Sequence, residues 1–135
     1  MPHPSDPPPE LFVSILRIAH CLFVSVPPEL RDSHARELND AIARRLAAER
    51  AVRGLIVDVS ALGLVDSYAA KVLEEIGSVS RSMGARAILV GLRPAVATTL
   101  VELGIDLLNV ETALSLEAAL AKLRVRIVTE DATDE

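Results

Sequence analysis

Residues 54–73 read GLIVDVSALGLVDSYAAKVL and join the most apolar strand pattern in the chain to its clearest helix pattern. The run from Gly54 to Val59 is almost continuously apolar, which predicts a strand buried on both faces of a parallel sheet. After a short loop, apolar residues recur at helical spacing from Ser67 to Met83. Gly84 follows, where a left-handed C-terminal residue is wanted. We therefore expect a central strand, a loop and a long helix.

Strand and helix patterns continue on both sides of this stretch. Upstream, the apolar runs Leu11–Ile18 and Cys21–Val26 lie too close together for anything but a hairpin. Its turn lacks the usual Gly or Asn, so we expect Ala19 or His20 to carry an unfavourable backbone angle. The other predicted elements are a helix capped by Asp32 or Ser33, a strand at Arg86–Val90, a helix from Pro94 to Gly104, a strand at Ile105–Val110 and a helix from Ser115 to about Arg124.

The predicted order is therefore β-β-α-β-α-β-α-β-α. Strands that alternate with helices require right-handed crossovers. We expect an α/β fold with a mostly parallel mixed sheet, covering helices and an opening β-hairpin.

The length of 135 residues fits one domain. Residues 1–10 hold five of the eight prolines, and we expect them to be a disordered lead-in. Residues 125–135 have the composition of an acidic flexible tail. The folded domain is accordingly predicted at residues 11–124.

Composition argues against several classes of partner and location. A net charge of −5 disfavours nucleic acid. The apolar stretches fall short of the roughly 18 residues that span a bilayer, so no membrane insertion is expected. One cysteine and no signal-peptide pattern at the amino end favour a cytoplasmic protein. Aromatic residues make up 2%, too few to form a stacking platform for bases or flat cofactors.

Motifs for catalysis are missing from the sequence. The glycines form no phosphate-binding loop, and no serine lies in a GxSxG elbow. The three histidines have no second metal ligand at suitable spacing. Cys21 is expected to be a buried structural thiol. We therefore expect no cofactor, no metal and no enzymatic activity, which argues against a small enzyme or nucleotide-binding domain.

Ser67 stands where the central strand's loop meets the long helix. A helix N-terminus offers backbone N–H groups and a positive dipole end, and so tolerates a phosphate. The plainer interpretation is that Asp66 or Ser67 is the N-cap. The residues alone leave both open.

Two stretches carry a resemblance to a known family. Residues 57–73, VDVSALGLVDSYAAKVL, resemble the signature of STAS domains, in which a partner kinase phosphorylates the serine after the aspartate. Residues 80–104 are similar to the stressosome members of that family, above all to RsbS-type scaffold proteins. The sequence departs from the family at Ala19-His20, where a Gly-Asn-like turn is usual, and at Pro27-Pro28 after the second strand.

The resemblance implies a non-enzymatic scaffold that assembles with RsbR-type sensor paralogues and with further copies of itself, as a dimer at least and in a large complex. It also implies that the scaffold holds an RsbT-type switch kinase and releases it when Ser67 is phosphorylated. Thr99 falls near a second threonine that is phosphorylated in the sensor paralogues. The alternative is an anti-sigma factor antagonist that binds its kinase directly and is regulated at Ser67.

The partner surface is expected at Asp66, Ser67 and Tyr68. Asp66 either orients the serine hydroxyl, helps to hold the kinase's metal-bound nucleotide, or caps the helix. Tyr68 is either an anchor that faces the partner or partly buried packing, and the enrichment of tyrosine at interfaces favours the anchor.

Overall fold

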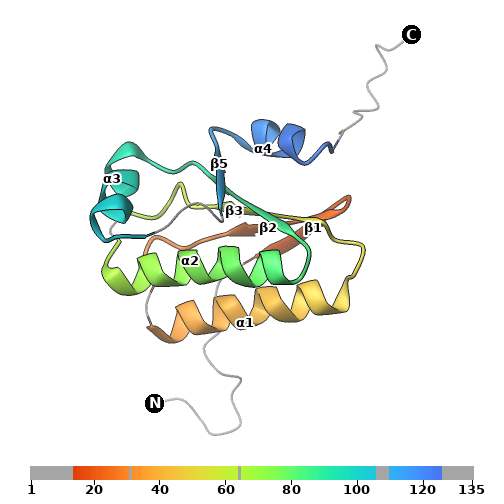
Figure 1. Cartoon of the computed structure of the whole chain (residues 1–135), viewed down its shortest axis with the longest axis horizontal. Helices are drawn as coiled ribbons and strands as arrows, with labels where there is room; N and C mark the ends of the chain where they lie inside the picture. Colours follow the sequence, from red (N-terminus) through yellow and green to blue (C-terminus); the bar gives the residue numbers. More distant parts are fainter. Residues whose placement is uncertain (1–13, 31, 64, 106–109, 126–135) are drawn as a thin grey trace, which may run out of the picture.

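Helices and strands alternate along the chain in the predicted order (Figure 1). The computed structural model describes residues 14–30, 32–63, 65–105 and 110–125, so the predicted lead-in and residues 126–135 of the predicted tail lie outside it. The elements are β1 (Ile15–Ile18), β2 (Cys21–Ser25), α1 (Asp32–Ala48), β3 (Gly54–Asp58), α2 (Ser67–Ser82), β4 (Arg86–Val90), α3 (Pro94–Glu102), β5 (Glu111–Ala113) and α4 (Leu116–Lys122). None of these helices is long and apolar enough to cross a membrane.

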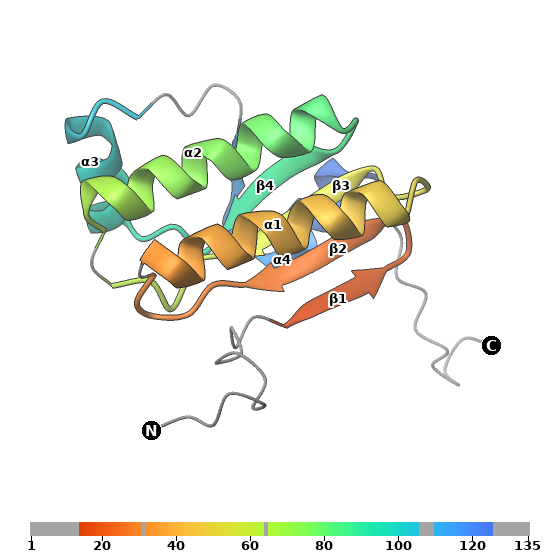
Figure 2. The same ribbon diagram turned by 90° about the horizontal axis from the view of Figure 1, so that it is seen from below.

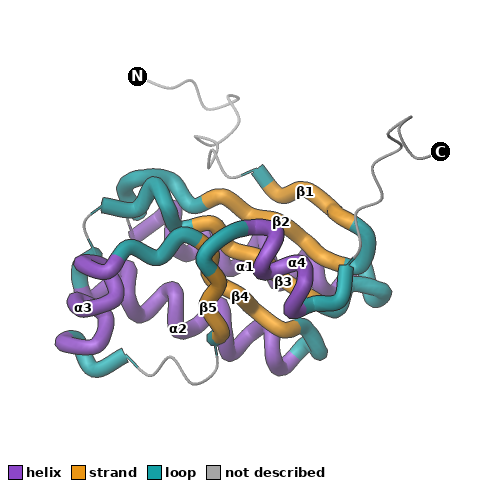
Figure 3. The backbone as a smooth tube through the Cα atoms, turned by 90° about the horizontal axis from the view of Figure 1, so that it is seen from above, coloured by secondary structure: helices purple, strands orange, loops and turns teal. Residues whose placement is uncertain are grey.

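The five strands form one mixed sheet in the order β1-β2-β3-β4-β5 (Figure 3). The pair β1-β2 is antiparallel, as the short connection requires, and the other neighbouring pairs are parallel. Strand β3 lies in the centre, with Val57 opposite Val24 on one side and Leu89 on the other. The mostly parallel sheet, its opening hairpin and its central strand are therefore confirmed.

Alternate side chains of the strands fill two separate cores. Leu55 and Val57 of β3 face α1 and α2, whereas Ile56 between them faces α4 on the other side of the sheet. Figure 1 shows α1 and α2 on one side of the sheet and α4 on the other. The apolar residues that recur at helical spacing along α1 are all buried against the sheet: Ala35, Leu38, Ile42 and Leu46.

The predicted helix ends agree with the backbone angles. Gly84 and Gly104 adopt φ values of +81° and +76°, and Pro94 is the first residue of α3. Ser115 caps α4 by accepting a hydrogen bond from the Ala118 N–H. Helix α1 begins at Asp32, but the side chains of Asp32 and Ser33, the two predicted caps, lie outside the described part of the chain.

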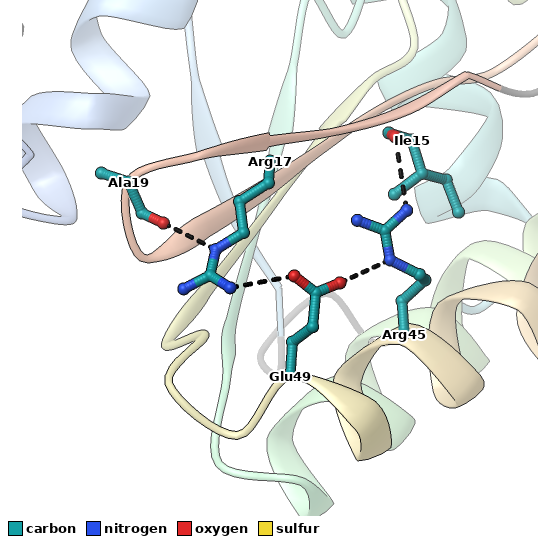
Figure 4. Close-up of polar contacts among 5 residues, drawn as sticks. All are labelled: Ile15, Arg17, Ala19, Arg45 and Glu49. Atoms are coloured by element: carbon teal, nitrogen blue, oxygen red, sulfur yellow. Dashed lines mark hydrogen bonds and ion pairs between the residues drawn. The ribbon is translucent and has the colours of Figure 1, made fainter.

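The hairpin turns at Ala19, which has a φ of +53° and so carries the predicted unfavourable angle. Arg17 donates a hydrogen bond to the Ala19 carbonyl and another to Glu49 at 2.9 Å (Figure 4). Glu49 also accepts a hydrogen bond from Arg45, which in turn donates to the Ile15 carbonyl. This network joins the edge strand β1 to the end of α1, and the two arginines lower the pKa of Glu49.

The last strand is not where the apolar pattern predicts it. Strand β5 is Glu111–Ala113 rather than Ile105–Val110, whose residues 106–109 lie outside the described ranges. Val110 is buried in the larger core and does not pair in the sheet. The polar strand is fastened by Arg86, which binds both carboxylate oxygens of Glu111 at 2.7 and 2.8 Å and lowers the pKa of Glu111.

Strand β1 is also shorter than predicted. It begins at Ile15, Ser14 before it is not part of the strand, and residues 11–13 lie outside the described ranges. Edge strands are commonly short, because a long exposed edge invites pairing with other chains.

Candidate functional site

Ser67 is the first residue of α2, at the end of the loop that follows the central strand. Its side chain and that of Asp66 are exposed. The first turn of α2 contains no acidic residue. The helix therefore presents an accessible hydroxyl at its positive end, where added negative charge is favoured.

Asp66 is the N-cap of α2. Its backbone is extended, and its carboxylate accepts a hydrogen bond from the Ala69 N–H at 2.8 Å. Of the two residues expected as the cap, Asp66 has this role, which leaves the Ser67 hydroxyl out of the capping bond. The other roles considered for Asp66, toward the serine or toward a kinase's nucleotide, stay predictions.

The loop before Ser67 is fastened to the loop that follows β4. Arg93 donates a hydrogen bond to the Leu62 carbonyl at 2.8 Å. Gly91 has a φ of +78° and lies against Ser60 so closely that a Cβ atom there would come 2.7 Å from the serine Cβ. Within the loop, the Ser60 N–H donates to the Asp58 carboxylate at 2.9 Å. These contacts hold the segment that leads into Ser67.

Tyr68 was expected either to anchor a partner or to be partly buried packing, and the structure shows the packing. It is half-buried and packs against the larger core, as in the packing alternative. It also lines a pocket of about 330 Å³ between α1 and α2, together with Asn39, Lys71 and Glu75 among others. Whether this side of Tyr68 contacts a partner stays a prediction.

The pocket beside Tyr68 is a feature that the sequence did not reveal. Asn39 donates a hydrogen bond to Glu75 at 3.3 Å across it, while the other amide atom of Asn39, Oδ1, is buried without a hydrogen-bond partner among the described residues. The two residues are 36 positions apart, and no local spacing signals such a contact.

Thr99 lies on α3, away from the start of α2 in the chain. Its side chain is half-buried, and its hydroxyl donates a hydrogen bond to the Ala95 carbonyl at 3.0 Å. In the turn before α3, Gly91 is left-handed and Arg93 is at the N-cap position without a side-chain capping bond. The modification of Thr99 stays a prediction.

Cys21 and His20 lie at the hairpin, near the end of α4. Cys21 is fully buried in the smaller core, as predicted, and burial raises the pKa of its thiol. His20 is half-buried, with its Nε2 3.2 Å from the Leu123 carbonyl. The described residues contain no group of three or more His, Cys, Asp or Glu side chains placed to hold a metal ion.

Comparison with known proteins gives a consistent result. The STAS domain model matches residues 13–119. A serine-to-glutamate variant of Moorella thermoacetica RsbS has a structure similar to this one, with a TM-score of 0.75 and 34% identity, over 84% of this chain and 95% of that chain. A structure described as the molecular architecture of the stressosome, a signal integration and transduction hub, has a TM-score of 0.74 and 35% identity, over 82% and 96%.

A relative from Bacillus subtilis aligns over a smaller part of its own length. The RsbT co-antagonist protein RsbRD of Bacillus subtilis is 32% identical over 97 residues, which are 71% of this chain and 34% of RsbRD. The chain therefore spans about a third of this relative. The STAS domain model covers most of the chain, and the sheet and helices have the order predicted from the sequence. The chain therefore belongs to the STAS domain family.

Proposed function

We propose that this protein is a non-enzymatic stressosome scaffold of the RsbS type, which assembles with RsbR-type paralogues and holds an RsbT-type switch kinase until Ser67 is phosphorylated. The observation that carries the proposal is the similarity to RsbS at 34% identity over 95% of that chain. A relative that shares nearly the whole length of a single-domain protein supports a shared role better than fold alone. RsbRD, named a co-antagonist of RsbT, supports the choice of partners.

The surroundings of Ser67 suit a phosphorylation switch. Phosphate adds about −1.5 to −2 charges at neutral pH. The N-terminus of α2 favours such a charge by roughly 0.3–2 kcal/mol, although the neighbouring Asp66 opposes it. Lys71 lies one turn further on the same helix face and pairs loosely with Glu74, with its Nζ 3.9 Å from the carboxylate, so a phosphate on Ser67 would compete with Glu74 for this counter-charge. We expect the domain to accept the phosphate without unfolding.

Release of the kinase then follows from a change at the contact surface. A kinase packed against unmodified Ser67 would have to bury the new phosphate beside the carboxylate of Asp66. Burying an unpaired charge costs several kcal/mol, so the complex dissociates without a large change in the scaffold. Tyr68 and Asp66 are proposed as parts of this surface.

The test compares two substitutions at Ser67. We expect Ser67→Asp to weaken binding of an RsbT-type kinase more than roughly tenfold, about 1.4 kcal/mol, because it introduces a permanent charge. Ser67→Ala should bind as the native protein does and should abolish phosphorylation by the kinase and ATP. Calorimetry gives the affinities, and mass spectrometry gives the phosphorylated residue.

The matched control is Ser78→Asp, which adds the same charge at an exposed serine of the same helix. It should bind the kinase normally. Equal affinity of Ser67→Asp and Ser67→Ala would contradict the proposal.

Phosphate found on Thr99 in the native protein, and lost in Thr99→Ala, would identify the second site.

Particle size separates this proposal from the alternative. Light scattering on the protein mixed with an RsbR-type paralogue should show one large, discrete particle. A monomer or dimer in the mixture would favour an anti-sigma factor antagonist that binds its kinase directly.

A further inference from the structure

The pocket beside Tyr68 is lined by charged side chains from two helices. Its volume of about 330 Å³ falls within the range of small-molecule sites. Four of its lining residues are charged: Arg36 and Asp40 of α1, and Lys71 and Glu75 of α2. All four are exposed at the surface, so a ligand in the pocket can reach them.

The two helices carry these charges in the same order. In α1, Arg36 comes four residues before Asp40, and in α2, Lys71 comes four residues before Glu75. Residues four apart are neighbours on one face of a helix, with their Cβ atoms about 5–6 Å apart. Each helix therefore presents a cation and, one turn later, a carboxylate.

Like charges of the two helices lie at the same end of the pocket. Helices α1 and α2 run side by side in the same direction, because each connects two parallel strands (Figure 2). Asn39 donates a hydrogen bond to Glu75 at 3.3 Å, which fixes the level of one helix against the other. Asp40 follows Asn39, so the two carboxylates share a level. Arg36 and Lys71 share the level one turn earlier. We call this site the dipolar pocket, with a cationic end and a carboxylate end.

Contacts within the protein leave these charges largely uncompensated. Arg36, Asp40 and Glu75 form no ion pair with another described residue. Lys71 pairs only loosely with Glu74, at 3.9 Å, and its side chain is 67% exposed. A ligand with two opposite charges therefore finds a partner for each of them in the dipolar pocket.

The remaining lining residues supply an apolar wall and an unsatisfied acceptor. Val72 is buried and Tyr68 is half-buried, and both line the pocket. Oδ1 of Asn39 is buried and has no hydrogen-bond partner among the described residues. A buried acceptor without a donor is unfavourable, so a donor bound at the carboxylate end is favoured.

We propose that the dipolar pocket binds a small zwitterion, whose carboxylate contacts Arg36 and Lys71 and whose ammonium group contacts the carboxylate end. The two charges of this ligand are separated by about one helical turn, 5.4 Å. A ligand with a single charge leaves the opposite end without a partner and therefore binds more weakly. The site lies within about one turn of Ser67, because Tyr68 and Lys71 line it. The proposal concerns the protein alone and does not rest on its role toward a kinase.

Titration of the isotope-labelled full-length protein with δ-aminovalerate tests the proposal by NMR. This compound carries an amine and a carboxylate at opposite ends of a short apolar chain. We expect it to bind at least roughly tenfold more tightly than valerate, which has only the carboxylate, and pentylamine, which has only the amine. The signals that shift should include the side-chain amide of Asn39 and the backbone amides of Tyr68 and Lys71.

One pair of substitutions removes the cationic end. Arg36→Gln/Lys71→Gln should weaken the binding of δ-aminovalerate at least roughly tenfold, because its carboxylate loses both partners. The control is Arg44→Gln/Arg124→Gln, which makes the same charge change at two exposed arginines that do not line the pocket. The control should bind as the native protein does.

A second pair removes the carboxylate end. Asp40→Asn/Glu75→Gln should weaken the binding of δ-aminovalerate by a similar factor, because its ammonium group loses both partners. Glu102→Gln/Glu117→Gln removes two exposed carboxylates elsewhere and should leave binding unchanged. Circular dichroism and the melting temperature show whether each variant is folded.

Several results would overturn the proposal. These are no saturable binding of δ-aminovalerate, equal affinity for valerate or pentylamine, shifted signals that lie away from the pocket, and native-like binding by either pocket variant. None of these measurements involves a kinase or a paralogue. Failure of this proposal therefore leaves the proposed function standing, and failure of the proposed function leaves the zwitterion site standing.

Discussion

Ser80 is a polar residue with no exposed surface, on the inner side of α2. Its hydroxyl has no hydrogen-bond partner among the described residues. A buried hydroxyl that has lost its bonds to water and gained none in the protein destabilises the fold.

Ser80→Ala should therefore raise the free energy of unfolding. We expect Ser80→Ala to increase the free energy of unfolding by about 1–3 kcal/mol more than Ser78→Ala does, because only Ser80→Ala removes a buried hydroxyl. Both substitutions gain the same helix propensity, and Ser78 is exposed on the same helix. Urea unfolding followed by circular dichroism measures both. An equal gain in the two variants would mean that the Ser80 hydroxyl costs nothing in the native protein.

Ser67 and Asp66 are adjacent candidates for the N-cap of α2, and only one of them makes the capping bond. The sequence offers two capping residues side by side, and either fits the pattern before α2. The structure assigns the capping bond to Asp66. Propensity alone does not separate them, because the choice depends on where the backbone turns into the helix.

At the scale of elements, the loops that follow the neighbouring strands β3 and β4 contact each other at the carboxyl ends of these strands. Gly91, after β4, lies against Ser60 in the loop after β3, and Arg93 donates to the Leu62 carbonyl. The contact of Gly91 with Ser60 leaves no room for a side chain at position 91. The hydrogen bond from Arg93 to Leu62 joins residues 31 positions apart in the sequence.

Gly91→Ala should destabilise the protein more than Gly84→Ala. Both glycines are left-handed, so both substitutions strain the backbone, but a Cβ at Gly84 meets nothing within 4 Å. The clash with Ser60 should add about 1–3 kcal/mol to the loss of unfolding free energy. Urea unfolding of the two variants gives the difference. Equal losses would show that the loops move apart freely.

The helices and most strands are predictable because their burial follows regular spacing, as in α1 and β3. The last strand is not, because Glu111 and Thr112 are polar and are placed by pairing with β4 and by the Arg86 ion pair. In the candidate site, the position of Ser67 at the start of α2 is predictable, because it follows from the strand and helix patterns. The contact of Arg93 with Leu62 depends on the order of the strands in the sheet and has no local signal.

At the scale of the whole molecule, two half-buried glutamates fasten the two edges of the sheet. Glu49 joins β1 to α1, and Glu111 joins β5 to β4. Hydrogen bonds from arginine side chains lower the pKa of each carboxyl below its ordinary value of 4.5. Each is therefore more acidic in the folded than in the unfolded chain.

These two carboxylates should make stability depend on pH. Their contribution is complete above pH 4.5 and is lost as the pH falls through the lower folded-state values, because the unfolded chain then binds protons more readily. Glu49→Gln/Glu111→Gln should therefore lose stability at neutral pH and show a shallower decline on acidification. Urea unfolding across the acid range measures this.

The control for this prediction is Glu37→Gln/Glu102→Gln. It removes two exposed glutamates that form no ion pair with another described residue. It should follow the pH profile of the native protein. A steep native-like decline in the Glu49→Gln/Glu111→Gln variant would show that the edge contacts are too solvent-screened to contribute.

The strands lie in the sheet in the same order in which they occur in the chain. Each strand pairs with the one synthesised just before it, and none has to be inserted between two strands that are already paired. On the ribosome, the sheet can therefore grow at one edge while translation continues, with each crossover helix covering it in turn. The central strands of this chain can thus be paired before its last helix has been translated.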